Sequence, residues 1–346
     1  MSRTVAPSSY CDSSPTMVGR IHELERLLAL LSVARAGRPS FVLLGGEAGI
    51  GKTTLAEALT REARRAGANV LTGRCYDLTM TPPYGPWTEL LRSVALTPQR
   101  SGDLNGAQTQ LDLFEHVWEI IARMAADQPL VLVLEDLHWA DQASLDLLRF
   151  VGRRAESAPT LLALLVIATY RDDALRQQQL LSQMLAALVR EARAERISLH
   201  PFDRATTETF LRTRYTLPKA DESRLVEYLL TRGDGNPFFM SELLRSLEDE
   251  WMLRQSDAGW RVADLNRVRI PAIIRQVLDT RVARLTPRHS PHSGLPQSSV
   301  KMWGLFCGIP SAGWTIRNSR ISSMRLLKRG CWWRCQTEVD SASAMR

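Results

Sequence analysis

The chain has 346 residues, of which 45% are hydrophobic, so it is long enough for two or three globular domains with a sizeable core. Its net charge of +7 is concentrated at one end, because residues 289–346 hold 8 Lys or Arg and only 2 Asp or Glu. The first 288 residues hold the other 36 Lys or Arg and 35 Asp or Glu. Because the first 288 residues are nearly neutral, the basic overall charge does not indicate that they bind nucleic acid. The longest apolar run, residues 161–169, is too short to cross a bilayer, and five irregularly spaced cysteines favour a reducing compartment. We therefore expect a cytoplasmic protein without a membrane partner.

Short β-like runs alternate with helical patterns through the first 200 or so residues. The sequence predicts residues 1–16 to be a disordered segment and residues 17–202 to form one domain. Alternation of this kind predicts an α/β fold, with a five-stranded parallel sheet that has helices on both faces. The predicted strands are residues 41–44, 69–72, 130–134, 164–169 and 197–199.

The motif GEAGIGKT fits the pattern G-x-x-x-x-G-K-S/T in full, and it lies between the first predicted strand and a helix. Glycines in such a loop let the backbone approach phosphates closely, so that amide groups and the helix N-terminus converge on the anion. Lys52 would bind the β and γ phosphates of ATP, and the Thr53 hydroxyl would coordinate Mg²⁺. The alternative is an ordinary glycine-rich turn between a strand and a helix. The sequence thus predicts a P-loop NTPase, with Gly46, Glu47, Ala48, Gly49, Ile50, Gly51, Lys52, Thr53 and Thr54 as nucleotide-binding residues.

A second acidic element follows the third predicted strand, in the motif LVLVLEDLHWAD. Glu135 and Asp136 arrive at the strand end, where carboxylates can hold a metal ion and activate water. Spacing alone does not decide between these two roles. We assign Glu135 to Mg²⁺ and Asp136 to water activation, against the alternative of two solvated charges. His138 and Trp139 either belong to the site or only pack the turn before a helix that Asp141 begins.

Helical patterns replace the alternation after residue 202, and we assign residues 203–288 to a small helical lid domain. Asn236 is placed as a helix N-cap, with Pro237 at the first helical position. A further amphipathic helix is predicted at residues 270–287. Residues 289–346 show neither helical nor strand periodicity, so we expect a disordered or aberrant tail whose His and Cys spacing fits no usual zinc site.

Six motifs occur in order between residues 17 and 287, and they are MVGRIHELERLLALL, GGEAGIGKTTL, PYGPW, VLEDLHWADQASLDLL, IATYRDD and GDGNPFF. Together they resemble the ATPase module of the STAND class, and more narrowly the Orc1-like AAA-type domain of large ATP-binding LuxR-family transcriptional regulators. This resemblance implies a slowly hydrolysing switch whose bound ATP or ADP decides how two domains dock. It also implies the start of a winged-helix region before residue 288. The sensor and helix-turn-helix of such regulators are not found here, so we interpret the tail as truncated or out of frame and expect no specific DNA binding.

The resemblance also implies roles for single residues. Thr169 and Arg171 would form a sensor at the end of the fourth strand, where Arg171 reads the γ-phosphate within its own chain; the alternative for Arg171 is a solvated side chain. Pro237 would close over the base, although a plain helix start explains it equally. The residues implied to lie against the adenine are Val18, Gly19 and Arg20.

Other functional classes stay open at this point. A phosphotransferase would use the same loop but needs a second substrate site, for which the sequence has no motif. An oligomeric remodelling ATPase would self-associate and donate an arginine in trans, for which Arg190, Arg193 and Arg196 are candidates. A nucleotide-binding fragment without catalysis is the remaining alternative.

Overall fold

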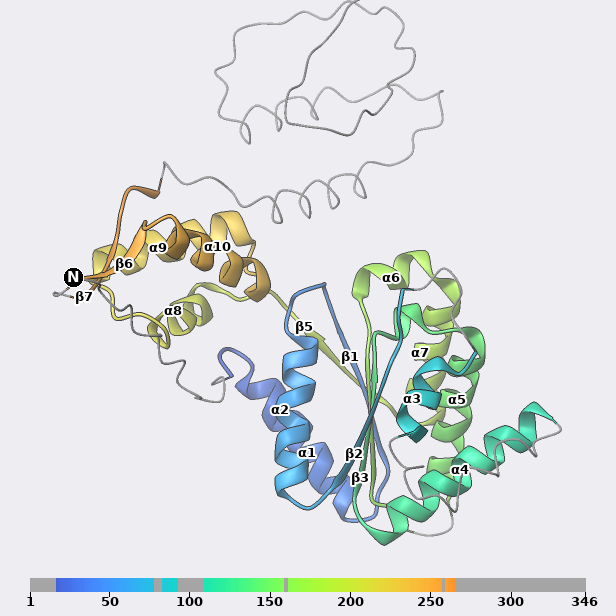
Figure 1. Cartoon of the computed structure of the whole chain (residues 1–346). Helices are drawn as coiled ribbons and strands as arrows, with labels where there is room; N and C mark the ends of the chain where they lie inside the picture. Colours follow the sequence, from blue (N-terminus) through green and yellow to red (C-terminus); the bar gives the residue numbers. More distant parts are fainter. Residues whose placement is uncertain (1–16, 78–82, 93–108, 159–160, 257–258, 266–346) are drawn as a thin grey trace, which may run out of the picture. The chain divides into compact units, whose positions relative to one another are not determined.

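The computed structural model describes residues 17–77, 83–92, 109–158, 161–256 and 259–265 (Figure 1). The predicted disordered segment at residues 1–16, the predicted helix at 270–287 and the predicted tail at 289–346 therefore lie outside the described residues. Among the helices of the described ranges, none combines the length and the apolar character that crossing a membrane requires.

Five strands form the parallel sheet that the sequence predicts. They are Ser40–Gly46 (β1), Asn69–Arg74 (β2), Leu130–Glu135 (β3), Leu164–Thr169 (β4) and Glu195–Leu199 (β5). The spatial order is β2, β3, β4, β1, β5, so β4 lies between β3 and β1. Leu44 of β1 pairs with Thr169 of β4, and Leu134 of β3 pairs with Ala168. The loop after β1 and the acidic residues after β3 consequently lie at the same edge of the sheet.

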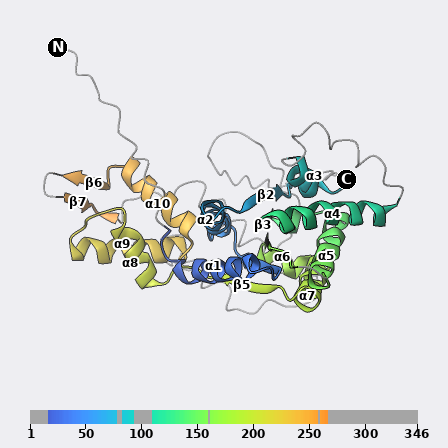
Figure 2. The same cartoon turned by 90° about the horizontal axis from the view of Figure 1, so that it is seen from below.

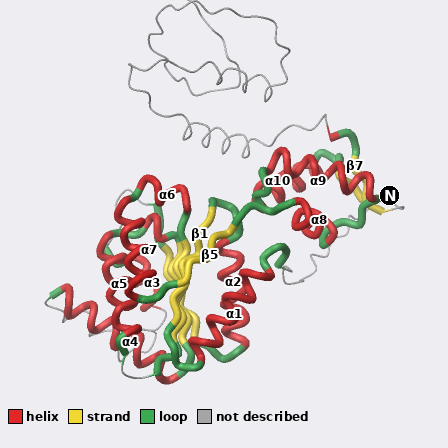
Figure 3. Tube along the Cα trace, turned by 180° about the vertical axis from the view of Figure 1, so that it is seen from behind, coloured by secondary structure: helices red, strands yellow, loops and turns green. Residues whose placement is uncertain are grey.

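Helices cover both faces of this sheet (Figures 1 and 3). Side chains of a strand point alternately to the two faces, so Leu132 of β3 packs in the core on one face while Val131 and Val133 pack in the core on the other. Coverage of both faces explains why the inner strands β1, β3 and β4 are buried throughout and mostly hydrophobic. One face is covered by Ile21–Arg35 (α1) and Lys52–Arg65 (α2), and the other by Gly85–Arg92 (α3), Gln110–Asp127 (α4), Gln142–Glu156 (α5), Asp172–Gln177 (α6) and Gln179–Glu191 (α7).

A small helical domain follows β5 (Figure 2). Its helices are Arg204–Arg212 (α8), Lys219–Gly233 (α9) and Pro237–Asp249 (α10), and they pack around a core of their own. An antiparallel hairpin of Leu253–Ser256 (β6) and Gly259–Val262 (β7) completes this domain. The hairpin was not predicted from the sequence. Each of its strands has four residues and buries one of them, so neither strand shows a periodic pattern.

Side-chain caps set where the helices next to the sheet edge begin. The Asp141 carboxylate accepts a hydrogen bond from the Ser144 amide at 2.9 Å, and α5 starts there. The Asn236 side-chain oxygen accepts one from the Phe238 amide at 3.1 Å, with Pro237 as the first residue of α10. Each bond satisfies a backbone donor that the first helical turn leaves unpaired. The predicted caps at Asp141 and Asn236 are confirmed.

We expect Leu132→Ala to lower the free energy of unfolding by about 2–5 kcal/mol, because the side chain is 0% exposed in β3 and its removal leaves a cavity. The matched control is Leu180→Ala in α7, where Leu180 is 61% exposed. That change should stay within about 0.5 kcal/mol. Urea unfolding of both variants measures the difference, and equal costs would contradict the burial of Leu132 in the core.

Candidate functional site

The loop between β1 and α2 has a backbone that only glycine adopts easily. Gly49 and Gly51 have φ angles of 77° and 103°, in the left-handed region. A Cβ atom on Gly49 would lie 2.8 Å from the Cβ of Phe238, whereas nothing lies within 4 Å of the equivalent point on Gly51. The loop is therefore in close contact with α10 at Gly49 and open at Gly51, directly before the N-terminus of α2.

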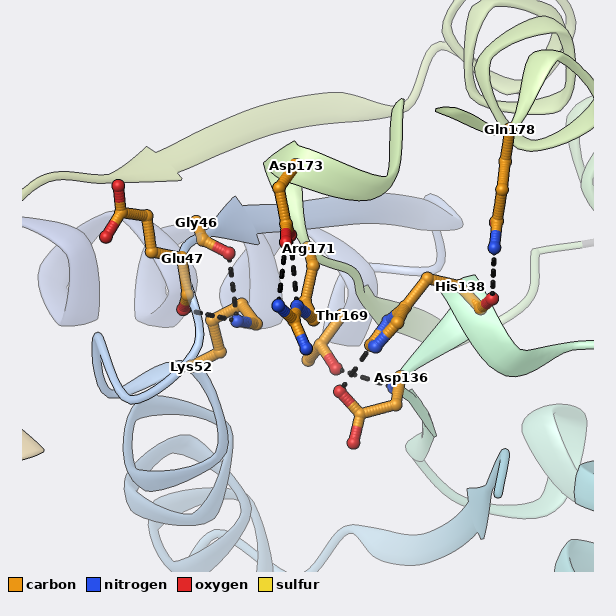
Figure 4. A network of polar contacts seen from close by, with 9 residues as sticks. All are labelled: Gly46, Glu47, Lys52, Asp136, His138, Thr169, Arg171, Asp173 and Gln178. Atoms are coloured by element: carbon orange, nitrogen blue, oxygen red, sulfur yellow. Dashed lines mark hydrogen bonds and ion pairs between the residues drawn. The ribbon is translucent and has the colours of Figure 1, made fainter. Parts of the chain in front are cut away.

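Lys52 is held within the curve of this loop. Its ammonium Nζ donates to the carbonyl oxygens of Gly46 at 3.0 Å and Glu47 at 2.8 Å (Figure 4). Lys52 is 7% exposed, and burial lowers the pKa of its ammonium group while Asp136 opposes that shift. These two hydrogen-bond acceptors are neutral, so an anion at the loop would gain a charge-assisted bond from Lys52.

A cavity of 840 Å³ opens beside the loop, which is a typical size for a small-molecule site. Its walls come from the segment before α1, the loop and α2, the residues after β3 and β4, and the helical domain. The residues that line it are Met17, Val18, Arg20, Ala48, Gly49, Ile50, Gly51, Lys52, Thr53, Thr54, Asp136, His138, Trp139, Arg171, Phe202, Phe210, Thr213, Arg214, Pro237, Phe238 and Ser241.

Most of the predicted site residues line this cavity, but five do not. The exceptions are Gly19, Gly46, Glu47, Glu135 and Thr169, which hold or pack behind the lining residues. Pro237 of the GDGNPFF motif was predicted and belongs to the wall that the helical domain contributes. The other residues of this wall were missed, because they reach the cavity only through the docking of the two domains. The missed residues are Phe202, Phe210, Thr213, Arg214, Phe238 and Ser241.

The two acidic residues at the end of β3, Glu135 and Asp136, have different surroundings. The Glu135 side chain is 6% exposed, and its Oε2 lies 2.6 Å from Nε of Arg74 at the end of β2. Burial raises the pKa of Glu135, and Arg74 opposes that shift. The Asp136 side chain is 46% exposed and lines the cavity. Asp136 is thus the carboxylate at the cavity, whereas Glu135 is paired behind it.

The backbone of Asp136 is strained, with φ of 59° and ψ of 47°. A non-glycine residue in this left-handed region persists only where its surroundings impose it. The Asp136 amide donates to the Thr169 hydroxyl at 3.0 Å (Figure 4), and Thr169 is 1% exposed at the end of β4. Thr169 therefore fixes the direction of Asp136 rather than facing the cavity itself.

Arg171 lines the cavity two residues after Thr169, and a carboxylate already engages it. Its Nε donates to Oδ1 of Asp173 at 3.0 Å and its Nη2 donates to Oδ2 at 2.7 Å (Figure 4). Such a planar, two-bond arrangement suits phosphate as well as carboxylate. A bound phosphate would compete with Asp173 for this guanidinium.

Arg20 ties the segment before α1 to the cavity wall. Its Nη2 donates to the carbonyl oxygens of His200 at 2.6 Å and Ile50 at 3.2 Å. Its guanidinium carbon lies 4.9 Å from the ring centre of Phe202. Its buried Nε has no hydrogen-bond partner among the described residues, which leaves a donor beside the cavity. Burial lowers the pKa of Arg20, and Glu23 opposes that shift.

The N-terminus of α10 contacts the loop directly. The Asn236 side-chain nitrogen donates to the Ala48 carbonyl oxygen at 2.9 Å, and the Phe238 amide donates to the Gly49 carbonyl oxygen at 3.3 Å. Asn236 is 1% exposed. The helical domain therefore contacts this loop through two backbone carbonyl groups.

His138 is a buried side chain at the same edge, in the short 3₁₀ turn Leu137–Trp139. Its Nδ1 lies 3.9 Å from Oδ1 of Asp136 and has no hydrogen-bond partner among the described residues (Figure 4). Burial lowers the pKa of His138 to about 4, Asp136 opposes the shift, and Arg171 adds to it. The ring is therefore neutral at neutral pH.

The oxygen donors at the cavity suit a hard cation. Thr53 lies in the first turn of α2 and lines the cavity. Within the described ranges, no three His, Cys, Asp or Glu side chains gather as a metal site. Magnesium is usually bound by one or two protein oxygens together with phosphates and water, so this sparse donor set fits Mg²⁺ better than a metal that needs a full protein cage.

The chain is similar to known proteins in sequence and in fold. Residues 16–167 match the protein-family model described as "AAA ATPase domain", and this part of the chain is an AAA-type P-loop ATPase domain. Among solved structures, a Walker-type ATPase of Pyrococcus abyssi is similar with a TM-score of 0.52 and 15% identity, over 78% of this chain and 75% of that one. The ORC2 protein of Aeropyrum pernix has a TM-score of 0.49 and 16% identity, over 80% of this chain and 71% of that one. At 15% identity, the likeness to the Pyrococcus abyssi ATPase shows a shared fold.

Curated relatives are similar over a shorter stretch. Thymidylate kinase of Xanthomonas oryzae pv. oryzae is 36% identical over 92 residues, which are 27% of this chain. The chain spans 38% of the length of that kinase. A match of this extent covers part of a domain.

Acidification should destabilise the protein through His138. The unfolded chain gains the imidazole proton near pH 6.5, but burial holds the folded pKa at about 4. Between these values the unfolded state binds more protons, so the His138 contribution is present above pH 6.5 and is lost as the pH falls. The wild type should lose about 2 kcal/mol of unfolding free energy between pH 7 and pH 5 relative to His138→Leu. Urea unfolding at the two pH values checks this, and parallel losses in both proteins would contradict it.

Proposed function

We propose, on the premise that residues 16–167 form an AAA-type ATPase domain, that this chain is a switch ATPase of the STAND type. It binds ATP with Mg²⁺ in the 840 Å³ cavity, hydrolyses it slowly, and docks its helical domain according to the bound nucleotide. We further propose that it is the ATPase portion of a transcriptional regulator. The observation that carries the proposal is that one cavity joins the P-loop, the acidic residue after β3 and the N-terminus of α10.

Phosphate binding rests on Lys52 and the open N-terminus of α2. The α2 macrodipole and the amide groups of the loop favour an anion at Gly51, and Lys52 adds a full charge. Arg20 is proposed to lie against the base, together with Val18 and Pro237, which line the same cavity. The unpaired Nε of Arg20 and the neighbouring ring of Phe202 support this placement.

Hydrolysis is assigned to the acidic residues after β3. Asp136 at the cavity is the proposed general base, because a carboxylate there can accept a proton from water. Glu135 is proposed to act on the metal through water, in addition to its ion pair with Arg74, and Thr53 is the proposed direct ligand. Bound Mg²⁺ would neutralise phosphate charge and polarise the γ-phosphoryl group.

The switch is assigned to Arg171 and α10. Moving a two-state equilibrium from 1:99 to 99:1 needs about 5.5 kcal/mol of differential affinity. Bonds to charged groups contribute about 1.5–3 kcal/mol each, so Lys52 and Arg171 acting on one γ-phosphate are sufficient. The ion pair of Arg171 with Asp173, which a phosphate could replace, and the contact of Asn236 with Ala48 support a path from nucleotide to helical domain.

A phosphotransferase is the second candidate function, because the curated relatives include kinases. It would transfer the γ-phosphoryl group to an acceptor in place of water. Release of inorganic phosphate from ATP in the absence of any acceptor favours the switch ATPase over the kinase. For a self-associating remodelling ATPase, the phosphate-release rate per chain would instead rise steeply with protein concentration.

We expect Lys52→Ala to abolish ATP binding, because the phosphates lose their main point charge. ATP with Mg²⁺ at a hundred times the dissociation constant should stabilise the wild type by about 2.7 kcal/mol. Thermal unfolding with and without ATP measures this shift. Lys219→Ala, at the exposed start of α9, is the matched control and should keep the full shift. An equal ATP shift in the Lys52→Ala protein would contradict the assignment of the loop.

Arg171→Ala should narrow the difference between ATP and ADP affinity, since a residue that contacts the γ-phosphate contributes nothing to ADP binding. Loss of one charge-assisted contact should weaken ATP binding by about 1.5–3 kcal/mol. Titration calorimetry with both nucleotides measures the two affinities, and ADP is the internal control. A parallel loss for ATP and ADP would make Arg171 a structural residue.

A further inference from the structure

His138 is the buried polar side chain at the cavity that the proposed function does not yet use. Its ring lines the cavity together with Asp136 and Arg171 (Figure 4). Its side chain is 4% exposed, and its Nδ1 has no hydrogen-bond partner among the described residues. Leaving a buried polar atom unpaired costs about 1–3 kcal/mol, so an apolar side chain would be the more stable choice here.

The local fold does not require a polar ring at this position. The 3₁₀ turn is held by its backbone, since the Trp139 amide donates to the Asp136 carbonyl oxygen at 2.8 Å. Gln178 also binds the backbone of His138, with its side-chain nitrogen donating to the His138 carbonyl oxygen at 3.0 Å. The ring itself packs against Trp139 with centroids 4.9 Å apart, a contact that an apolar side chain would also make. The unpaired Nδ1 therefore has no structural role in the turn.

The position of Nδ1 relative to Asp136 suits a shared partner. The 3.9 Å between Nδ1 and the Asp136 Oδ1 is too long for a direct hydrogen bond. Both atoms can instead bind one oxygen atom placed at about 2.8 Å from each. Thr169 and the left-handed backbone hold the main chain of Asp136 in place, and its carboxylate lies beside Nδ1 of His138.

We propose that His138 and Asp136 together hold the water that attacks the γ-phosphate, with His138 Nδ1 and Asp136 Oδ1 each accepting one of its two hydrogen bonds. This inference rests on the proposed ATP hydrolysis. A water molecule whose two protons are both engaged turns its lone pairs away from the pair of acceptors, toward phosphorus. The neutral ring carries its own proton on Nε2 in this arrangement.

The chemical step balances with these groups alone. The water oxygen forms a bond to the γ-phosphorus while the bond from phosphorus to the β–γ bridging oxygen breaks, and its electron pair leaves with ADP. One water proton passes to the Asp136 carboxylate. The other stays on the new phosphate, where Nδ1 of His138 still accepts its hydrogen bond. His138 is thus a water-positioning residue, and its neutrality at neutral pH is what leaves Nδ1 able to accept.

Three substitutions of His138 test which ring atom matters. His138→Asn keeps a side-chain oxygen on the Cγ atom, at the place of Nδ1, whereas His138→Gln puts its amide one carbon farther out, near the place of Nε2. His138→Leu fills space without any polar atom. Single-turnover hydrolysis of ATP with Mg²⁺ gives the rate of the chemical step, and calorimetry gives the dissociation constants for ATP and ADP.

We expect His138→Leu and His138→Gln to lower the single-turnover rate by ~10²-fold, since a misplaced nucleophile costs about that much. His138→Asn should stay within ~10-fold of wild type, and all three should bind ATP and ADP as the wild type does, since the ring is not assigned to the phosphates. The aluminium fluoride complex of ADP imitates the attacked phosphoryl group. It should bind more weakly to His138→Leu and His138→Gln than to the wild type or to His138→Asn.

A wild-type rate for His138→Leu, or equal rates for His138→Asn and His138→Gln, would overturn the inference while leaving the proposed function intact. If His138→Leu fails to fold, the comparison of the two amide variants still decides. Failure of the wild type to bind ATP would contradict the proposed function itself. A wild type that binds ATP without hydrolysing it would overturn the assigned hydrolysis and this inference together.

Discussion

The Asn236 side chain connects the domains at the point where the phosphate loop turns, with one hydrogen bond inside the helical domain and one to the loop. Its oxygen caps α10 by accepting from the Phe238 amide, and its nitrogen donates to the Ala48 carbonyl oxygen. Because Asn236 is 1% exposed, losing either partner would leave a buried polar group unpaired at a cost of about 1–3 kcal/mol. A change in the loop backbone is therefore also a change in the start of α10. The close approach at Gly49, where no Cβ fits, follows from the same contact.

At the edge of the sheet, charged and polar side chains differ in whether they are buried or face the cavity. Glu135 is buried and paired with Arg74, whereas Asp136 one residue later turns into the cavity through a left-handed backbone. Strain of about 1–3 kcal/mol at such a residue is retained when a site needs that direction. His138 contributes an unpaired acceptor beside Asp136, and Arg171 contributes a guanidinium held by Asp173. In the proposed function, Asp136 and His138 hold the attacking water and Arg171 contacts the γ-phosphate.

The sequence predicted the parallel sheet and the helix caps because both follow from local patterns. The inner strands β1, β3 and β4 have continuous apolar runs. Asn236 and Pro237 mark the start of α10 within two residues. The phosphate loop was likewise predicted from a short, continuous motif. The pairing of Glu135 with Arg74 was not predictable, because it depends on β2 lying beside β3, which no motif encodes. Phe202 and Phe210 were missed for a similar reason, since an apolar residue in a helical domain gives the same pattern whether it faces a core or a cavity.

Nucleotide-dependent docking of α10 on the phosphate loop is the central claim. Hydrogen exchange of the Phe238 amide measures it directly, because this amide donates both to the Asn236 side chain and to the Gly49 carbonyl oxygen. The exchange rate should be compared for the free protein, the ADP complex and the complex with a non-hydrolysable ATP analogue. We expect the Phe238 amide to exchange at a different rate in the triphosphate complex than in the ADP complex, while amides in the α9 core do not change. Identical exchange of Phe238 in the two nucleotide complexes would contradict it.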